Sequence, residues 1–146
     1  MILSFALALL AHSLTPPELV QSDFVDDTHQ PDWADLEVEP EGVVAVDLAY
    51  IDTVEVDGVE YPVALMRLTD RNAKGDPSVF DLLQAVDCEG LRMGLVELWT
   101  MRPTDGLPAR IEAPKVEWDT VRDLPAPGRR VLFGAKCGPD WVDPVG

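Results

Sequence analysis

The sequence has few of the side chains from which most catalytic and zinc sites are built. Its 146 residues include two histidines and two cysteines. After residue 13, His29 is the only histidine, and Ser22 and Ser78 are the only serines. A nucleophile–base pair or a zinc site needs several such groups close together, and the glycines form no phosphate-binding loop. The sequence therefore predicts a non-catalytic protein with no metal and no cofactor.

Basic residues are also scarce, with 11 Lys and Arg against 27 Asp and Glu, a formal net charge of −16. Binding to nucleic acid or to anionic membranes needs clustered Lys and Arg. The composition therefore argues against both kinds of partner. The hydrophobic fraction of 47% is ordinary for a globular protein, and the length suits one domain.

A long apolar run occupies residues 2–11, and no other segment approaches the ~20 apolar residues of a membrane-spanning helix. The run has the length of the hydrophobic part of a secretory signal, and Ala11 and Ser13 supply small residues before a cleavage point. No Lys or Arg precedes the run, unlike in most signals. We expect residues 1–13 to be a signal peptide and the protein to be periplasmic or secreted. The alternative is an apolar helix packed on the core.

The two cysteines, Cys88 and Cys137, have a different expected state in each compartment. In an exported protein, two cysteines indicate one disulfide. Such a bond closes a loop of about 50 residues, for which the chain-entropy model gives roughly 4 kcal/mol. In the cytosol the same residues are expected to be buried free thiols.

The rest of the chain is predicted to form a leader and one domain. Residues 14–32 are polar and contain prolines, so we interpret them as a leader before a single β-rich domain, residues 33–146. The 13 prolines are spread along the chain, which favours short strands and turns over long helices. Prolines near the ends of the last predicted strand place it at a sheet edge. The predicted strands cover residues 43–51, 54–56, 61–68, 91–101 and 110–116, with hairpin turns at Asp57-Gly58 and Asp105-Gly106.

A short helix is predicted over residues 127–137, where Gly138 provides the stop. Its apolar residues Val131, Leu132 and Ala135 are expected to face the core.

Residues 76–88 are ambiguous. They have a helical stripe at i, i+3, i+4 and i+7 behind a possible Asp-Pro start. They also have apolar residues on alternate positions, which is typical of a strand. The local pattern slightly favours the helix. The stripe consists of Val79, Leu82, Leu83 and Val86, and the strand face of Phe80, Leu82, Val86 and Cys88.

The abundant acids provide no specific metal or catalytic motif. Asp23, Asp26 and Asp27 lie close together, but they lack the Asp-x-Asp-x-Asp-Gly loop and the later Glu of a calcium site. We interpret them as a solvated acidic stretch. With 27 acids in the chain, no pair such as Asp47 and Asp87 stands out as a general acid and base.

Three residues near the C-terminus are candidate contacts with a protein partner. Arg129 and Arg130 form the one adjacent basic pair, which can meet acids on a partner. The alternative for this pair is a solvated helix start. Trp141 lies in a Pro- and Gly-rich tail and is expected to be exposed, whereas the first two tryptophans are expected in the core.

A series of landmarks runs along residues 33–137. A tryptophan, Trp33, opens the domain, and a Tyr-x-Asp step follows at Tyr50-Ile51-Asp52. A hairpin at Asp57-Gly58 comes next, with its return strand over residues 61–68. An Asp-Cys step, Asp87-Cys88, is followed by Arg92, and the second cysteine, Cys137, comes after Trp118 in the C-terminal segment. In this order the landmarks resemble the surface-adhesin protein E family of exported bacterial proteins.

This resemblance implies an α+β fold, in which a mostly antiparallel β-sheet packs against a C-terminal helix and a Cys88–Cys137 bond joins the two. It also implies a strand over residues 79–88, and we follow it there because a strand places Cys88 at a sheet end. Named members of the family look like adhesins that bind host matrix proteins and plasma factors.

The sequence as a whole predicts a small exported binding or structural domain of the bacterial envelope. Its expected partner is an unidentified protein in the envelope or outside the cell. One alternative is a cytosolic acidic inhibitor that binds a basic partner, as a mimic of nucleic acid does. The other is a small hydrolase that works through carboxylates, which requires a pocket holding two acids of raised pKa.

Overall fold

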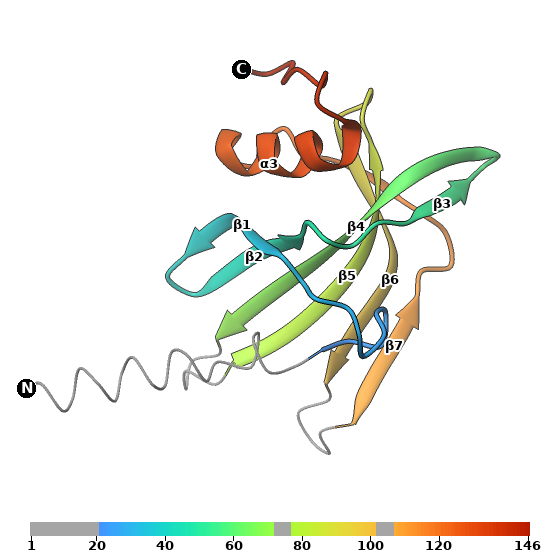
Figure 1. Ribbon diagram of the computed structural model, residues 1–146, viewed down its shortest axis with the longest axis vertical. Coiled ribbons are helices and arrows are strands. Elements are labelled where there is room, and N and C mark those ends of the chain that lie inside the picture. Colours follow the sequence, from blue (N-terminus) through green and yellow to red (C-terminus); the bar gives the residue numbers. More distant parts are fainter. Residues whose placement is uncertain (1–20, 72–76, 102–106) are drawn as a thin grey trace, which may run out of the picture.

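The computed structural model describes residues 21–71, 77–101 and 107–146. The predicted signal peptide, residues 1–13, and the predicted Asp105-Gly106 turn lie outside the described residues. The described part of the chain folds into eight strands and one helix (Figure 1). Their bounds are β1 Trp33–Glu39, β2 Gly42–Asp47, β3 Thr53–Val56, β4 Val59–Arg71, β5 Pro77–Asp87, β6 Arg92–Met101, β7 Pro108–Glu112, β8 Trp118–Thr120 and α3 Ala126–Cys137.

The strands form one antiparallel sheet in the order β1-β2-β4-β5-β6-β7. Two short strands lie off this path, since β3 pairs with the first part of β4 and β8 pairs with the first part of β6. Helix α3 packs on one face of the sheet near one end (Figure 1). The predicted architecture, an antiparallel sheet with a C-terminal helix and one disulfide, is confirmed.

The β3–β4 hairpin turns at the predicted Asp57-Gly58 step. Both residues have positive φ, 50° and 81°, and Val56 pairs with Val59 directly across the turn. Two central residues of positive φ are what a two-residue hairpin turn requires, and Asp-Gly is a favoured pair for it. The predicted edge position of the last predicted strand is confirmed as well, because β7 ends the strand order.

The ambiguous segment, residues 76–88, contains strand β5 and not the helix that its local pattern slightly favoured. It pairs with β4 on one side and with β6 on the other, so it lies inside the sheet. Both of its faces are largely covered, and apolar residues therefore occur on odd and even positions alike. Such a run satisfies a helical period by accident, and only pairing with neighbouring strands decides between the two structures.

The main core lies between the sheet and α3. Leu132 and Phe133 of the helix are fully buried against residues of the central strands. The expected inward face of the helix was only partly right, because Val131 and Ala135 are exposed. Gly128 and Arg129 complete the buried face, and a glycine there lets the helix approach the backbone of β1 at Leu36. The sheet side of the core consists of Leu36, Val46, Ala64, Met66, Val86, Leu91 and Met93.

The opposite face of the sheet carries a second, smaller core, which corrects the interpretation of residues 21–32. Tyr50, Val63, Leu65 and Leu83 form it, and residues 24 and 25 pack against it. The described end of the predicted leader therefore lies on the domain, although β1 does begin at Trp33 as expected. The two apolar residues in this otherwise polar stretch, Phe and Val, are the physical reason.

Replacing Gly128 should test the close approach of α3 to β1. An added Cβ at this residue would collide with the carbonyl oxygen of Leu36, so we expect Gly128→Ala to destabilise the protein by about 2 kcal/mol. Gly134 in the same helix has open space around it, so Gly134→Ala should be neutral or stabilising by up to about 1 kcal/mol. Urea unfolding of both variants measures the difference. Equal stability of the two would contradict this account of the helix packing.

Candidate functional site

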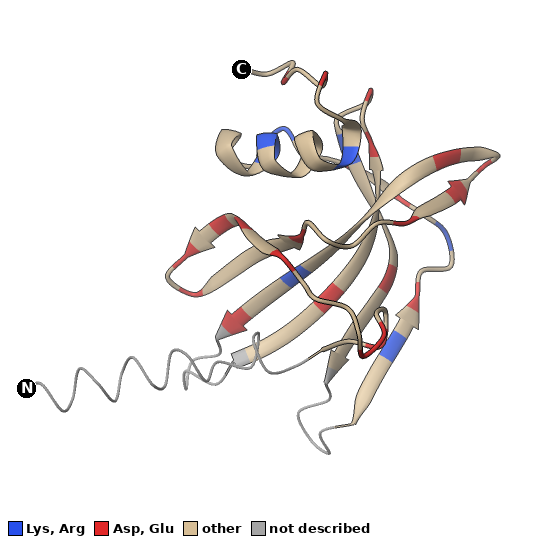
Figure 2. Cartoon of the chain, in the orientation of Figure 1, with Lys and Arg blue, Asp and Glu red and all other residues tan. Residues whose placement is uncertain are grey.

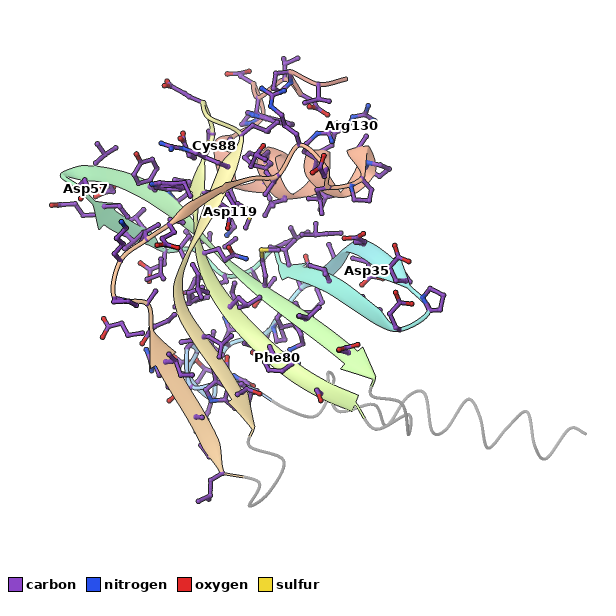
Figure 3. The ribbon with its side chains drawn as sticks, turned by 180° about the vertical axis from the view of Figure 1, so that it is seen from behind. Asp35, Asp57, Phe80, Cys88, Asp119 and Arg130 are labelled. Atoms are coloured by element: carbon purple, nitrogen blue, oxygen red, sulfur yellow. A yellow bond between two sulfur atoms is a disulfide. The ribbon has the colours of Figure 1, made fainter. Side chains whose placement is uncertain are left out.

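The predicted disulfide joins the end of β5 to the end of α3. Cys88 and Cys137 are 49 residues apart in sequence, and their Cα atoms lie 5.8 Å apart. Figure 3 shows Cys88 beside the helix, at the end of the sheet from which the β3–β4 hairpin projects. The bond therefore anchors the last turn of α3 at one wall of the groove described next.

A groove of about 730 Å³ opens where β4 and β5 separate. The β4–β5 ladder ends at the partners Val63 and Ala85. The next residue of β4 toward the hairpin is Pro62, which has no N–H to continue the exchange of hydrogen bonds. Beyond it β4 pairs only with β3 and projects away from the sheet (Figure 1). The walls of this fork groove are Val59, Glu60, Tyr61, Pro62, Val86, Asp87, Cys88, Glu89, Gly90 and Arg92.

A chain of four side chains links the two walls of the fork groove. The rings of Tyr61 on β4 and Trp118 on β8 have centroids 4.8 Å apart. The guanidinium of Arg92 lies over the Trp118 ring at 4.7 Å, and its Nε donates to Asp87 Oδ2 at 2.6 Å. Aromatic faces attract cations, so these contacts hold Arg92 between a ring and a carboxylate.

The carboxylate of Asp87 is held ionised by its neighbours. Burial alone would raise the pKa of Asp87, but hydrogen bonds from Arg92 and from the backbone N–H of Gly90 lower it below its ordinary value. Arg92 neutralises this charge. The two exposed acids of the groove, Glu60 and Glu89, form no ion pair within the described part of the chain. The groove therefore keeps uncompensated negative charge beside an aromatic pair.

Arg129 is not available to a partner, which corrects its place among the predicted contacts. It is 4% exposed, and its Nε and Nη2 donate to the Asp143 carboxylate at 2.8–3.0 Å. Its Nη1 donates to the carbonyl oxygens of Arg122 and Leu124. Three segments thus meet on one guanidinium, and adjacency in sequence gave no sign that this arginine turns inward while its neighbour turns out.

The other two predicted contacts lie nearer to the surface. The side chain of Arg130 is 57% exposed, with its Nε 4.0 Å from Asp143. Trp141 is half-buried and not fully exposed as expected, because its ring stacks on Phe133 at 5.2 Å between centroids. Arg130 remains open to a partner, whereas Trp141 extends the main core.

A second cluster, which the sequence did not reveal, forms around the buried carboxylate of Asp47. This side chain is fully buried, and its Oδ2 lies 2.6 Å from His29 Nε2. Its Oδ1 accepts the backbone N–H groups of Asp32 and Ala49 at 2.9 Å each. Asp47 therefore fixes the described end of the predicted leader on the domain. Only the fold brings these residues together, since His29 and Asp47 are distant in sequence.

The Asp47 cluster borders a smaller hollow of about 360 Å³, lined in part by His29, Tyr50 and Ile51. Burial and the nearby Asp52 raise the pKa of Tyr50 to about 12. Burial lowers the pKa of Lys136, against the opposing effect of Asp47, and its Nζ donates to the carbonyl oxygen of Tyr50 at 2.6 Å. Lys136 thus ties the end of α3 to the loop after β2.

The chemistry of the Asp47 cluster is that of a base held by an orienting carboxylate, with no nucleophile attached. No hydroxyl or thiol of the described residues makes a hydrogen bond to His29, and the buried Ser22 Oγ has no partner. Among the described residues, the carboxyl groups with a displaced pKa are displaced downward, namely Asp26, Asp87, Glu97 and Asp143. Within the described ranges, no group of three His, Cys, Asp or Glu side chains is placed to hold a metal ion.

Comparisons with protein families, with curated proteins and with solved structures gave no match to this chain. Among the described residues, α3 is too short and too polar to cross a membrane.

Exchanging each of the two adjacent arginines for methionine should separate their roles. Arg129→Met removes the guanidinium that pairs with the Asp143 carboxylate and donates to two backbone carbonyls, so we expect a loss of about 3 kcal/mol in unfolding free energy. Arg130→Met removes an exposed charge and should change stability by no more than about 0.5 kcal/mol. Urea unfolding measures both. Similar losses for the two variants would overturn the assignment of Arg129 as structural.

Acid stability should reflect the Arg129–Asp143 pair. The hydrogen bonds from Arg129 lower the pKa of Asp143 below its ordinary value of 3.8. A carboxyl group with a lowered folded-state pKa stabilises the protein above the unfolded value, and this contribution is lost as the pH falls through the folded value. We therefore expect the stability gap between the wild type and Asp143→Asn to be largest above about pH 5 and to shrink toward about pH 2. Exposed Asp140→Asn is the control, and a gap that does not change with pH would contradict the prediction.

Proposed function

We propose that this protein is a small exported domain of the bacterial envelope that binds a protein partner and has no catalytic activity. The observation that carries the proposal is the Cys88–Cys137 bond, which joins a strand end to a helix end with ordinary Cα spacing. Disulfides persist in oxidising compartments and are rare in the cytosol. The apolar run of residues 2–11 supports the same location.

Within the described residues, no hydroxyl or thiol is hydrogen-bonded to His29, and this supports the proposal of a binding role over a catalytic one. A carboxylate-dependent hydrolase needs an acid whose pKa is raised so that it can donate a proton. The displaced carboxyl groups are moved in the opposite direction by arginine partners and hydrogen bonds. His29 is oriented by Asp47, but its contacts serve the attachment of residues 29–32 to the domain.

The resemblance to surface-adhesin protein E remains part of the proposal. A sheet packed against a C-terminal helix, with a disulfide between them, is the arrangement that the resemblance implies. Figure 2 shows acidic residues on the β1–β2 hairpin and on the β3–β4 hairpin. We therefore propose an adhesin-like or scaffold role with a partner that tolerates or uses negative charge.

A cytosolic inhibitor of a basic partner is the second candidate, and the acidic hairpins favour it. The same charge that suits an exported binder would suit a mimic of nucleic acid. The two candidates differ in compartment and in the state of the cysteines. In the cytosol the disulfide would be exposed to reduction by the glutathione and thioredoxin systems.

Intact mass from fractionated native cells should decide between these candidates. We expect the mature protein in the periplasmic or extracellular fraction, shortened by about the 13 residues of a signal. Alkylation should label both cysteines after reduction and neither cysteine before it. Full-length protein in the cytosolic fraction with two freely alkylated thiols would overturn the proposal and leave the inhibitor as the better candidate.

A further inference from the structure

The fork groove presents a strand edge that no other part of the described chain pairs with. Val63 donates its N–H to the carbonyl oxygen of Asp52, on the β3 side of the strand. Backbone groups alternate between the two sides of a strand, so Tyr61 and Val59 also face β3, with which they pair. Glu60 therefore directs its N–H and C=O away from β3 and into the fork. A free edge of this kind is a template for another extended chain.

The side chains around this edge favour a basic segment. Glu60 and Glu89 contribute uncompensated negative charge from opposite walls, and the Tyr61–Trp118 pair supplies aromatic surface. The chain's own Arg92 shows that the site suits a cation, because its guanidinium lies between the Trp118 ring and the Asp87 carboxylate. With a formal charge of −16, long-range attraction also draws basic chains toward the molecule.

We propose that the fork groove binds an extended basic segment of a partner protein. The segment pairs through its backbone with Glu60 of β4 and places Lys or Arg side chains against the carboxylates of Glu60 and Glu89. The disulfide keeps the β5 wall in position, because Cys88 lines the groove and is bonded to the end of α3. This inference rests on the proposed binding function and specifies the face and the chemistry of the partner.

Two other candidate binding sites, the hollow beside His29 and the edge of β7, have fewer features that would bind a ligand or a partner chain. The hollow beside His29 lacks a nucleophile and a metal-binding group within the described residues. The exposed edge of β7 begins with a proline, and its Arg110 is already held by Glu97. Within the described residues, the fork groove combines an unpaired strand edge with charge and aromatic surface.

The test uses the mature, oxidised protein and a labelled peptide in which lysine alternates with valine. Binding is measured by fluorescence anisotropy, and amide shifts in ¹⁵N-labelled protein locate the site. We expect shifts at residues 59–61 and 86–90, since Pro62 has no amide N–H. The double variant Glu60→Gln/Glu89→Gln should weaken binding by about fivefold or more, since two exposed ion pairs are lost. The matched control, Glu39→Gln/Glu41→Gln on the β1–β2 hairpin, has the same net charge and should change the affinity by less than about twofold.

A second peptide tests the backbone pairing directly. N-methylation at alternate residues removes the donors that would pair with the strand edge, so the methylated peptide should bind more weakly than its parent. The inference would be overturned by no detectable binding of the parent peptide or by amide shifts that map to another face. It would also be overturned if the two double variants weakened binding equally, or if the methylated peptide bound as tightly as its parent. A protein that is exported and oxidised but fails to bind the peptide refutes only the groove. A cytosolic, reduced protein refutes the proposed function instead.

Discussion

The disulfide between Cys88 and Cys137 holds helix α3 on one face of the sheet. Helix α3 has no side-chain hydrogen bond at its N-cap, and much of its surface faces solvent, so its own sequence stabilises it only weakly. The disulfide holds its last residue against the end of β5. Leu132 and Phe133 are thereby kept over the central strands, and the tail that follows can return Asp143 to Arg129.

Buried charges position the remaining segments, and each of them has its partners. Asp47 accepts two backbone N–H groups and contacts His29. Arg67 and Asp81 pair across neighbouring strands through two hydrogen bonds at 2.7 and 2.9 Å, with Trp33 over the guanidinium. Because an unpaired buried charge is costly, these contacts permit few alternative positions for the strands and loops that carry them.

The sequence predicted correctly those turns and helix ends that depend on the conformational preferences of one or two neighbouring residues. The Asp57-Gly58 turn follows from two residues that accept positive φ, and the helix stop follows from Gly138. Residues 77–87 were ambiguous because a strand covered on both faces shows no alternation, so its pairing with β4 and β6 had to decide.

The sequence alone could not predict most of the candidate site, because its residues are brought together by packing and strand order. Arg129 differs from Arg130 only in the direction in which α3 presents it, and the direction depends on how the helix packs. The fork groove is lined by residues of β4, β5 and β6, with Trp118 of β8 against Tyr61, and the sequence does not state the order of these strands. Pro62 was the one local signal, since a proline in an interior strand indicates that its ladder is interrupted.

The position of the free edge follows from the length of β4. This strand of 13 residues is longer than its neighbour can match, so β3 and β2 cover one side of it in succession while β5 covers only part of the other. The outer edge β1 carries exposed acids, and β7 is short and begins with a proline, two devices that discourage pairing with other chains. The unpaired stretch of β4 also carries an acid and a proline, Glu60 and Pro62, but both residues line a groove that holds a second acid, Glu89, and the backbone of Glu60 is unpaired on that side. Within the described residues, the side of β4 that faces the fork is unpaired at Glu60, and this is where we propose that a basic chain pairs.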